Sequence, residues 1–110
     1  MNAYELEQLT AELDASGKLY LEFLRAPSMS LGLYTLPAGG RDTQQPHTED
    51  EVYYILRGRG HIRVGDEDRP VGPGSTVFVA ARVEHRFHSI TEDLLILVFF
   101  APAEYTYRGG

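Results

Sequence analysis

The chain has 110 residues, of which 43% are apolar, no cysteine, and a formal net charge of −6. This length suits one domain with one hydrophobic core, and the apolar fraction argues against a disordered chain. The missing cysteines exclude disulfides, thiolate metal sites and cysteine nucleophiles, and the acidic balance disfavours nucleic acid as a partner.

No segment predicts secretion or a membrane partner. The longest apolar run, residues 94–102, is too short to span a bilayer as a helix. The N-terminus has the pattern of an acidic helix, not of a charged and then apolar signal peptide. We therefore expect a soluble, cytoplasmic protein.

The N-terminal segment predicts a helix over about residues 3–15. Asn2 followed by Glu5 resembles a capping box, and Gly17 is a typical helix stop. Between them, apolar residues recur at helical spacing: Leu6, Leu9 and Leu13. This apolar stripe needs a surface to cover.

After Gly17 the apolar residues change to the period of two that is typical of strands. The predicted strands are residues 19–23, 29–33, 51–56, 61–64, 76–79, 85–90 and 94–101. Glycine and proline separate them, and residues 65–68 and 70–74 are predicted to be turns. Many short strands at close spacing after one helix predict an all-β sandwich or closed barrel.

The strand pattern assigns the histidines to different faces. Glu51 shares a face with Tyr53, and His85 shares a face with Phe87, so all four point toward the core. The remaining two histidines, His61 and His88, alternate with inward residues and are expected to face water.

A carboxylate at Glu51 inside an apolar barrel is costly unless a partner or a cation compensates it. A metal ion held also by His47 and His85 would supply that cation. Two imidazoles and one carboxylate form the ligand set of non-haem iron sites with open positions. The same set suits Mn, Ni, Cu and Zn, so the sequence indicates one divalent transition metal of open identity.

Each of these residues also has a simpler interpretation. His47 could be a surface histidine hydrogen-bonded to Glu49. Glu51 could lie on an exposed strand and pair with Arg57 or Arg86, which is what a register shift of one residue would produce.

Two spaced patterns resemble the motifs of the cupin family. Residues 39–58 read Gly39-(x5)-Gln45-x-His47-(x3)-Glu51-(x6)-Gly58, and residues 74–89 read Gly74-(x5)-Ala80-x-Arg82-(x2)-His85-(x3)-Ser89. The resemblance implies one cupin domain over residues 1–110: a double-stranded β-helix, or jelly-roll barrel, after a short helix. It also implies a metal site formed by four residues: Gln45, His47, Glu51 and His85.

The sequence departs from the family pattern at four positions. Cupins usually have His where this chain has Gln45, so Gln45 is either a fourth ligand or a loop residue whose place water takes. They usually have Pro, Gly and Asn where it has Ala80, Arg82 and Ser89, at positions that hold no metal.

The resemblance implies a small-molecule ligand inside the barrel, near Tyr53 and Phe87. These two residues would line a substrate pocket or form plain core. A metal-dependent oxygenase is one candidate function. An isomerase or lyase, or a sensor that binds a small molecule or metal without turnover, fits the same site.

The outer face of the predicted sheet suggests self-association. Val52, Tyr54 and Leu56 point away from the face of Glu51, and residues 94–100 are apolar on both faces. Such a surface is normally covered, here by the N-terminal helix or by a second subunit. We expect a homodimer with Tyr54 near the centre of its interface.

Overall fold

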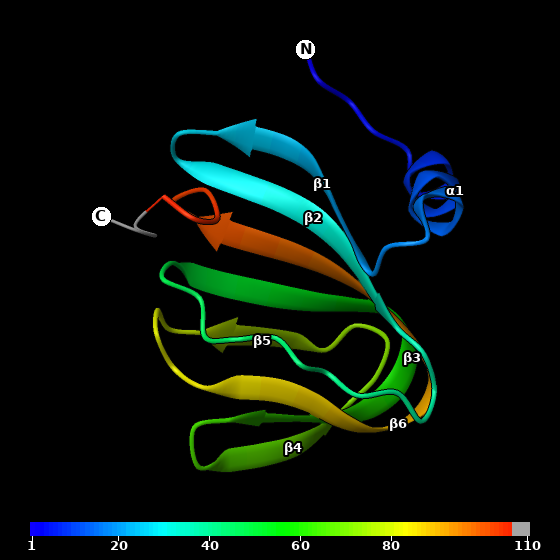
Figure 1. The fold of residues 1–110 in the computed structure, drawn as a ribbon, viewed down its shortest axis with the longest axis vertical. Helices are drawn as coiled ribbons and strands as arrows, with labels where there is room; N and C mark the ends of the chain where they lie inside the picture. Colours follow the sequence, from blue (N-terminus) through cyan, green and yellow to red (C-terminus); the bar gives the residue numbers. More distant parts are fainter. Residues whose placement is uncertain (107–110) are drawn as a thin grey trace.

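The computed structural model describes residues 1–106, in which one helix precedes six strands (Figure 1). The elements, in chain order, are α1 (Leu6–Ser16), β1 (Tyr20–Ala26), β2 (Met29–Leu36), β3 (Asp50–Val64), β4 (Glu67–Val71), β5 (Thr76–Val79) and β6 (His85–Ala101). Every strand pairing is antiparallel, which confirms the predicted all-β class.

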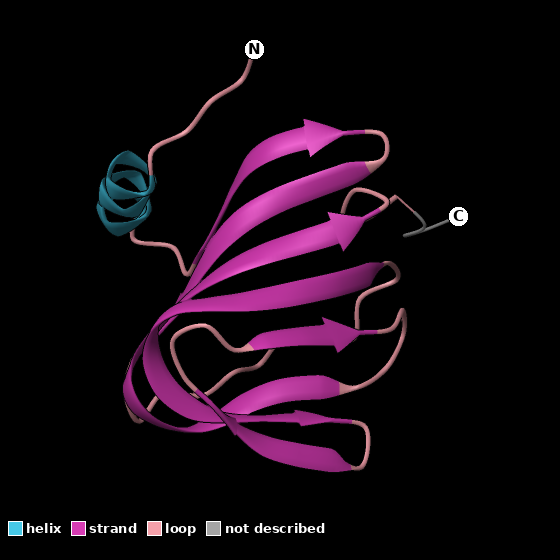
Figure 2. Cartoon of the chain, turned by 180° about the vertical axis from the view of Figure 1, so that it is seen from behind, coloured by secondary structure: helices cyan, strands magenta, loops and turns pink. Residues whose placement is uncertain are grey.

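The strands form one curved sheet in the order β1-β2-β6-β3-β4, and β5 pairs with the first half of β3. The two central strands are long, with 15 residues in β3 and 17 in β6. Both bend strongly, so each contributes to the upper and the lower half of the barrel (Figures 1 and 2). The sheet thereby folds over on itself around an interior space.

The bend in β3 lies at Gly58, where two separate strands were predicted. Gly58 has a φ of +93°, and a Cβ there would lie 2.2 Å from the carbonyl oxygen of Asp93 on β6. Only glycine allows this close approach at positive φ. The pairing of β3 with β6 shifts register between Ile55 and His61 and then continues. The predicted break was wrong because glycine here bends the strand without ending it.

The prediction of turns over residues 65–68 and 70–74 was also wrong in part. Residues 67–71 form β4, which pairs with the end of β3. Pro70 lies opposite His61 in this pairing. Because β4 is an edge strand, the missing N–H of a proline is tolerated there.

The helix begins later than predicted. It starts at Leu6, and Glu5 occupies the N-cap position without a side-chain hydrogen bond to the backbone. The predicted capping box of Asn2 and Glu5 is therefore wrong, whereas Gly17 ends the helix in the left-handed conformation, at a φ of +69°. Within residues 1–106, no helix has both the length and the apolar character needed to cross a membrane.

The helix packs on the outside of the sheet, beside β1 and β2 (Figures 1 and 2). Leu9 and Leu13 contact Leu33 and Leu95, and Leu56 packs against the same group. The main core fills the interior with residues from the inner faces of the strands: Leu36, Tyr53, Ile55, Ile62, Val71, Val79, Phe87, Ile90, Leu94, Ile96, Val98 and Phe100. The inward placement predicted for Tyr53 and Phe87 is thus confirmed.

Replacing Leu13 with alanine tests whether the cluster that α1 forms with Leu33 and Leu95 is part of the cooperative fold. Leu13 is 1% exposed, so the truncation leaves a cavity and should lower the free energy of unfolding by about 2–5 kcal/mol. Leu6→Ala, on the same helix at 41% exposure, should change it by less than about 0.5 kcal/mol. Urea denaturation measures both. Equal stability of the two variants would show that the packing of α1 on the sheet does not contribute to the free energy of unfolding.

Candidate metal centre

His47, Glu51 and His85 come together inside the barrel. One ligand atom from each lies within 4.8 Å of the others. His47 Nδ1 is 3.1 Å and His85 Nε2 is 2.8 Å from the same oxygen, Glu51 Oε1. Glu51 is 2% exposed, which contradicts the alternative of an exposed strand residue paired with an arginine.

Three segments bring these residues together. Glu51 lies near the start of β3 and His85 is the first residue of β6, both on inner faces. His47 lies in the loop before β3. The turn before β6 holds that loop, because Arg82 N donates to the His47 carbonyl at 2.7 Å and Ala81 N donates to Asp50 Oδ1 at 2.8 Å. The two motifs are thus joined by hydrogen bonds from the backbone of this turn to the His47 carbonyl and the Asp50 carboxylate, as well as by the site itself.

The charges of the three groups depend on one another. Burial disfavours the charged form of His47, but its hydrogen bonds with Glu104 and Glu51 outweigh burial and raise its pKa to about 9. Burial likewise opposes the charge of His85, yet contact with Glu51 raises its pKa. The same two imidazoles overcome the effect of burial on Glu51 and lower the pKa of its carboxyl.

A divalent cation fits this arrangement, as two atoms indicate. Glu51 Oε2 is buried and has no hydrogen-bond partner among the described residues. His85 Nε2 is also without one, because its 2.8 Å contact with Glu51 Oε1 lacks hydrogen-bond geometry. Buried polar atoms are normally satisfied, and imidazole and carboxylate are donors that transition metals accept. His47, Glu51 and His85 are therefore positioned to bind a metal ion.

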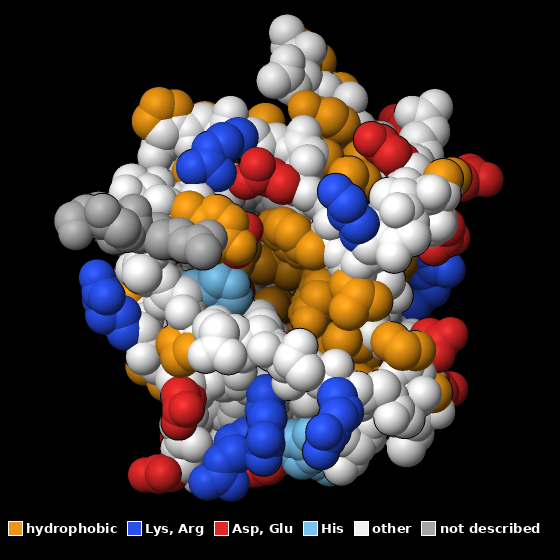
Figure 3. Space-filling view, in the orientation of Figure 1, with side chains coloured by type: hydrophobic (Ala, Val, Ile, Leu, Met, Phe, Trp, Pro, Cys, Tyr) orange, Lys and Arg blue, Asp and Glu red, His pale blue; other side chains and the backbone are white. Residues whose placement is uncertain are grey.

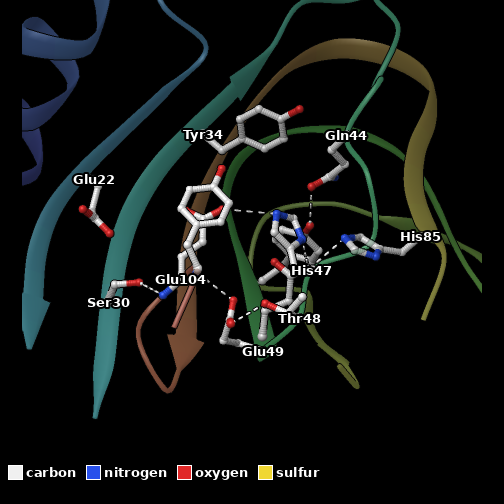
Figure 4. Close-up of polar contacts among 12 residues, drawn as sticks. Glu22, Ser30, Tyr34, Gln44, His47, Thr48, Glu49, His85 and Glu104 are labelled. Atoms are coloured by element: carbon white, nitrogen blue, oxygen red, sulfur yellow. Dashed lines mark hydrogen bonds and ion pairs between the residues drawn. The ribbon is translucent and has the colours of Figure 1, made fainter. Parts of the chain in front are cut away.

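The second nitrogen of each imidazole faces an acceptor outside the cluster of His47, Glu51 and His85. His85 Nδ1 lies 2.9 Å from the Val83 carbonyl oxygen, and His47 Nε2 lies 3.3 Å from Glu104 Oε2 (Figure 4). A metal-binding histidine normally donates its other N–H to such an acceptor, which fixes the orientation of the ring.

Gln45, the predicted fourth ligand, is exposed and lines a polar cavity of about 520 Å³ together with His85 and Arg86. Its neighbour Gln44 points inward instead, and Gln44 Oε1 accepts a hydrogen bond from Tyr53 Oη at 3.0 Å (Figure 4). Whether Gln45 joins the metal site stays a prediction.

A separate cavity of about 160 Å³ adjoins His47 and Glu51. Its lining comprises Tyr20, Tyr34, Gln44, His47, Glu51, Tyr53, Val98, Phe100, Glu104 and Tyr105. In the space-filling view, the middle of this face is hollowed between hydrophobic side chains (Figure 3). Tyr53 thus reaches the cavity, whereas Phe87 lies behind it, with the two rings 4.9 Å apart in an edge-to-face contact.

His61 and His88 lie away from this site. They are cross-strand partners on β3 and β6, and their rings stack with centroids 5.4 Å apart. His88 Nε2 contacts Asp68 Oδ2 on β4 at 2.8 Å. Neither histidine belongs to the group of possible metal ligands found among residues 1–106.

Sequence reasoning missed three polar residues around the site. Asp42 accepts hydrogen bonds from Tyr34 Oη at 2.9 Å and from the amide of Phe87 at 2.8 Å, and it also holds Gln44. Tyr20 and Glu104 face the cavity from opposite ends of the chain. Asp42 occupies an unspecified position of the first motif, Tyr20 and Glu104 lie outside both motifs, and no local pattern marks any of the three.

Comparison with known proteins identifies the fold family. The sequence model of the cupin domain matches residues 32–100, which is more than half of the chain. The protein is a cupin. Both predicted motifs and all three residues of the cluster lie within this match, so the resemblance inferred from their spacing is confirmed.

Relatives of this cupin are known in sequence and in structure. It is 51% identical over 104 residues to an uncharacterised protein of Streptomyces coelicolor, covering 94% of this chain and 99% of that one. A crystal structure of a Thermus thermophilus protein superposes with a TM-score of 0.71 at 26% identity, covering 94% and 99% of the two chains. The DMSP lyase DddQ of Ruegeria pomeroyi gives 0.65 at 26% identity, but the match covers 69% of this chain and only 39% of the lyase.

Substitution of single histidines tests the assignment. His47→Ala or His85→Ala should remove most of the bound metal, because two remaining donors hold a divalent ion poorly inside a barrel. His61→Ala and His88→Ala should leave the metal content unchanged. Elemental analysis after reconstitution and gel filtration measures all four variants. A wild-type metal content in His85→Ala would place the site elsewhere.

Proposed function

We propose that this cupin binds one divalent transition metal through His47, Glu51 and His85 and acts on a small organic molecule in the adjoining cavity. The observation that carries this proposal is the buried, unpartnered Glu51 Oε2 beside two imidazoles and an aromatic-lined space. A divalent ion at this point supplies a Lewis acid with open coordination positions and, if it is iron, a redox centre.

The cavity limits the size and polarity of the ligand. Its volume of about 160 Å³ is below the roughly 300–1,000 Å³ of pockets for drug-sized molecules. Within the part of the chain that the structure describes, Tyr20 Oη is buried beside the cavity without a hydrogen-bond partner. Burial raises the pKa of this phenol, so it stays a donor. We infer a small ligand that carries a hydrogen-bond acceptor for the Tyr20 hydroxyl. An oxygen or nitrogen of the same ligand would face the metal held by His47, Glu51 and His85.

Two reaction classes have support. Two imidazoles and one carboxylate with open positions are typical of non-haem iron oxygenases. Similarity to the DMSP lyase DddQ favours an elimination instead. A binding protein without turnover would use the same residues, because the cupin fold does not determine the chemistry.

Assays of the reconstituted protein distinguish these functions. Protein loaded with Fe²⁺, Mn²⁺, Ni²⁺ or Zn²⁺ is incubated with small organic acids and sulfonium compounds, in air and under nitrogen. Oxygen uptake with product indicates an oxygenase, and product under nitrogen indicates a lyase. A rise in melting temperature without product indicates a binder. Glu51→Ala should lose each of these activities, and equal metal content and activity in that variant would contradict the proposal.

Tyr20→Phe serves as the matched pocket variant in these assays. It removes one hydrogen-bond donor and should weaken binding of the active ligand by about 3–10-fold, the value of one hydrogen bond, while metal binding stays unchanged. Tyr54→Phe on the outer face is its control.

We also propose that two copies associate through the outer face of the sheet. Four apolar residues on neighbouring strands lie in one row there: Leu31, Phe99, Val52 and Phe78. Phe78 is 61% and Tyr54 39% exposed, and the cluster that α1 forms with Leu33, Leu95 and Leu56 does not include the residues of this row. A two-fold dimer is the most common closed arrangement that covers the same patch on both copies.

Sedimentation equilibrium at micromolar concentrations tests this association. The wild type should have the mass of a dimer. Phe78→Lys should shift it to the monomer without lowering the melting temperature of the barrel, because that side chain is already exposed. Leu6→Lys, an exposed apolar position on α1, is the control and should remain dimeric. A monomeric mass of the wild type would contradict the proposed dimer.

A further inference from the structure

The segment after β6 carries a carboxylate against the outer side of His47. Glu104 is 6% exposed, and its Oε2 lies 3.3 Å from His47 Nε2 (Figure 4). Residue 104 lies beyond the part of the chain that matches the cupin domain, residues 32–100. Family membership therefore does not account for this contact.

The backbone around Glu104 is held in place by three hydrogen bonds. Its N–H donates to Ser30 Oγ on β2 at 2.9 Å, and Ser30 is completely buried. Its carbonyl accepts from Arg25 Nη2 at 2.8 Å, and the N–H of Tyr105 donates to buried Glu49 at 2.8 Å. Three separate parts of the barrel, namely β1, β2 and the loop before β3, thus fix the backbone that carries this carboxylate.

The contact sets the orientation of the His47 ring. Its Nδ1 faces Glu51 and the metal-ligand cluster, whereas its Nε2 faces Glu104. Glu104 itself is not among the residues whose ligand atoms lie within 4.8 Å of one another, so it acts from behind the ring. An N–H on Nε2 held by this carboxylate leaves the lone pair of Nδ1 free for a metal.

The charge of Glu104 has a second effect. Of the three residues in the cluster, only Glu51 is an anion, which balances half the charge of a divalent ion. A second buried carboxylate behind His47 balances the rest, and buried charges are stable when they are compensated. His85 has no such partner, since its Nδ1 faces the neutral carbonyl of Val83.

We propose that Glu104 is a positioning residue of the metal site, which accepts a hydrogen bond from His47 Nε2–H and presents Nδ1 to the metal. This inference rests on the proposed metal binding by His47, Glu51 and His85. It assigns to the segment after β6 a role in metal affinity that lies outside the two cupin motifs.

The test compares Glu104→Gln, which keeps the shape and loses the charge, with Glu104→Ala, which loses both. Glu22→Gln is the control, since it makes the same charge change on β1, where Glu22 contacts Arg25 and lies farther from His47 than Glu104 does (Figure 4). Full-length protein stripped by a chelator is titrated with Co²⁺. The Kd should rise about 10–100-fold in Glu104→Ala and less in Glu104→Gln, and stay within about twofold in Glu22→Gln.

A second measurement separates positioning from a general loss of structure. In Zn²⁺-loaded, ¹⁵N-labelled wild type, the ring of His47 should show a proton on Nε2, slowed in exchange by Glu104, and metal on Nδ1. In Glu104→Ala that proton signal should disappear through exchange, while the backbone spectrum and the ring signals of His61 and His88 stay in place.

The outcomes distinguish the two proposals. If the wild type binds no Co²⁺, the proposal that this site binds a metal is contradicted, and the role inferred for Glu104 is contradicted as well. If His47→Ala abolishes binding but Glu104→Ala matches the wild type in Kd, only the role of Glu104 is overturned. A metal on Nε2 with the proton on Nδ1 would overturn it as well.

Discussion

The buried carboxylate of Glu51 is the group around which the interior of this barrel is arranged. An unpaired charge among residues such as Ile55, Val98 and Phe100 would cost several kcal/mol, so its neighbours must compensate it. Two imidazoles meet the same oxygen, and each ring is held from behind by a further acceptor. The loop before β3 and the turn before β6 are tied together at the same point. Barrel closure and the site therefore depend on the same contacts.

The three central residues could be predicted from the sequence because strand geometry is regular. Side chains alternate between two faces, so Glu51 and Tyr53 had to lie on one face of β3 once Val52 and Tyr54 were assigned to the other. The structure confirms this alternation, and it places His85 on the inner face of β6 by the same rule. Motif spacing then linked two strands that are distant in sequence, which periodicity alone does not do.

Other features depend on contacts that a local pattern does not record. Gly58 resembled a strand break, yet its closeness to Asp93 of β6 makes it a bend. Arg82 and Ser89 have positive φ angles of 68° and 49°, so the backbone keeps a conformation suited to the Gly and Asn usual in cupins after those residues have changed. Both positions depart from the usual residues of the second cupin motif. The backbone angles show that the fold tolerates the resulting strain, on the order of 1–2 kcal/mol per residue.

The two histidines of the site illustrate how one barrel can support different chemistry. His85 is oriented by a carbonyl two residues away, a contact that follows from the turn and is neutral. His47 is oriented by a charged side chain 57 residues later in the sequence (104 − 47), on a segment that also lines the cavity. A change at Glu104 therefore alters both the charge beside His47 and the lining of the cavity. His47, Glu51 and His85, which are positioned to bind a metal ion, all lie within residues 32–100, whereas the segment after β6 contributes a carboxylate behind His47 and part of the lining of the cavity.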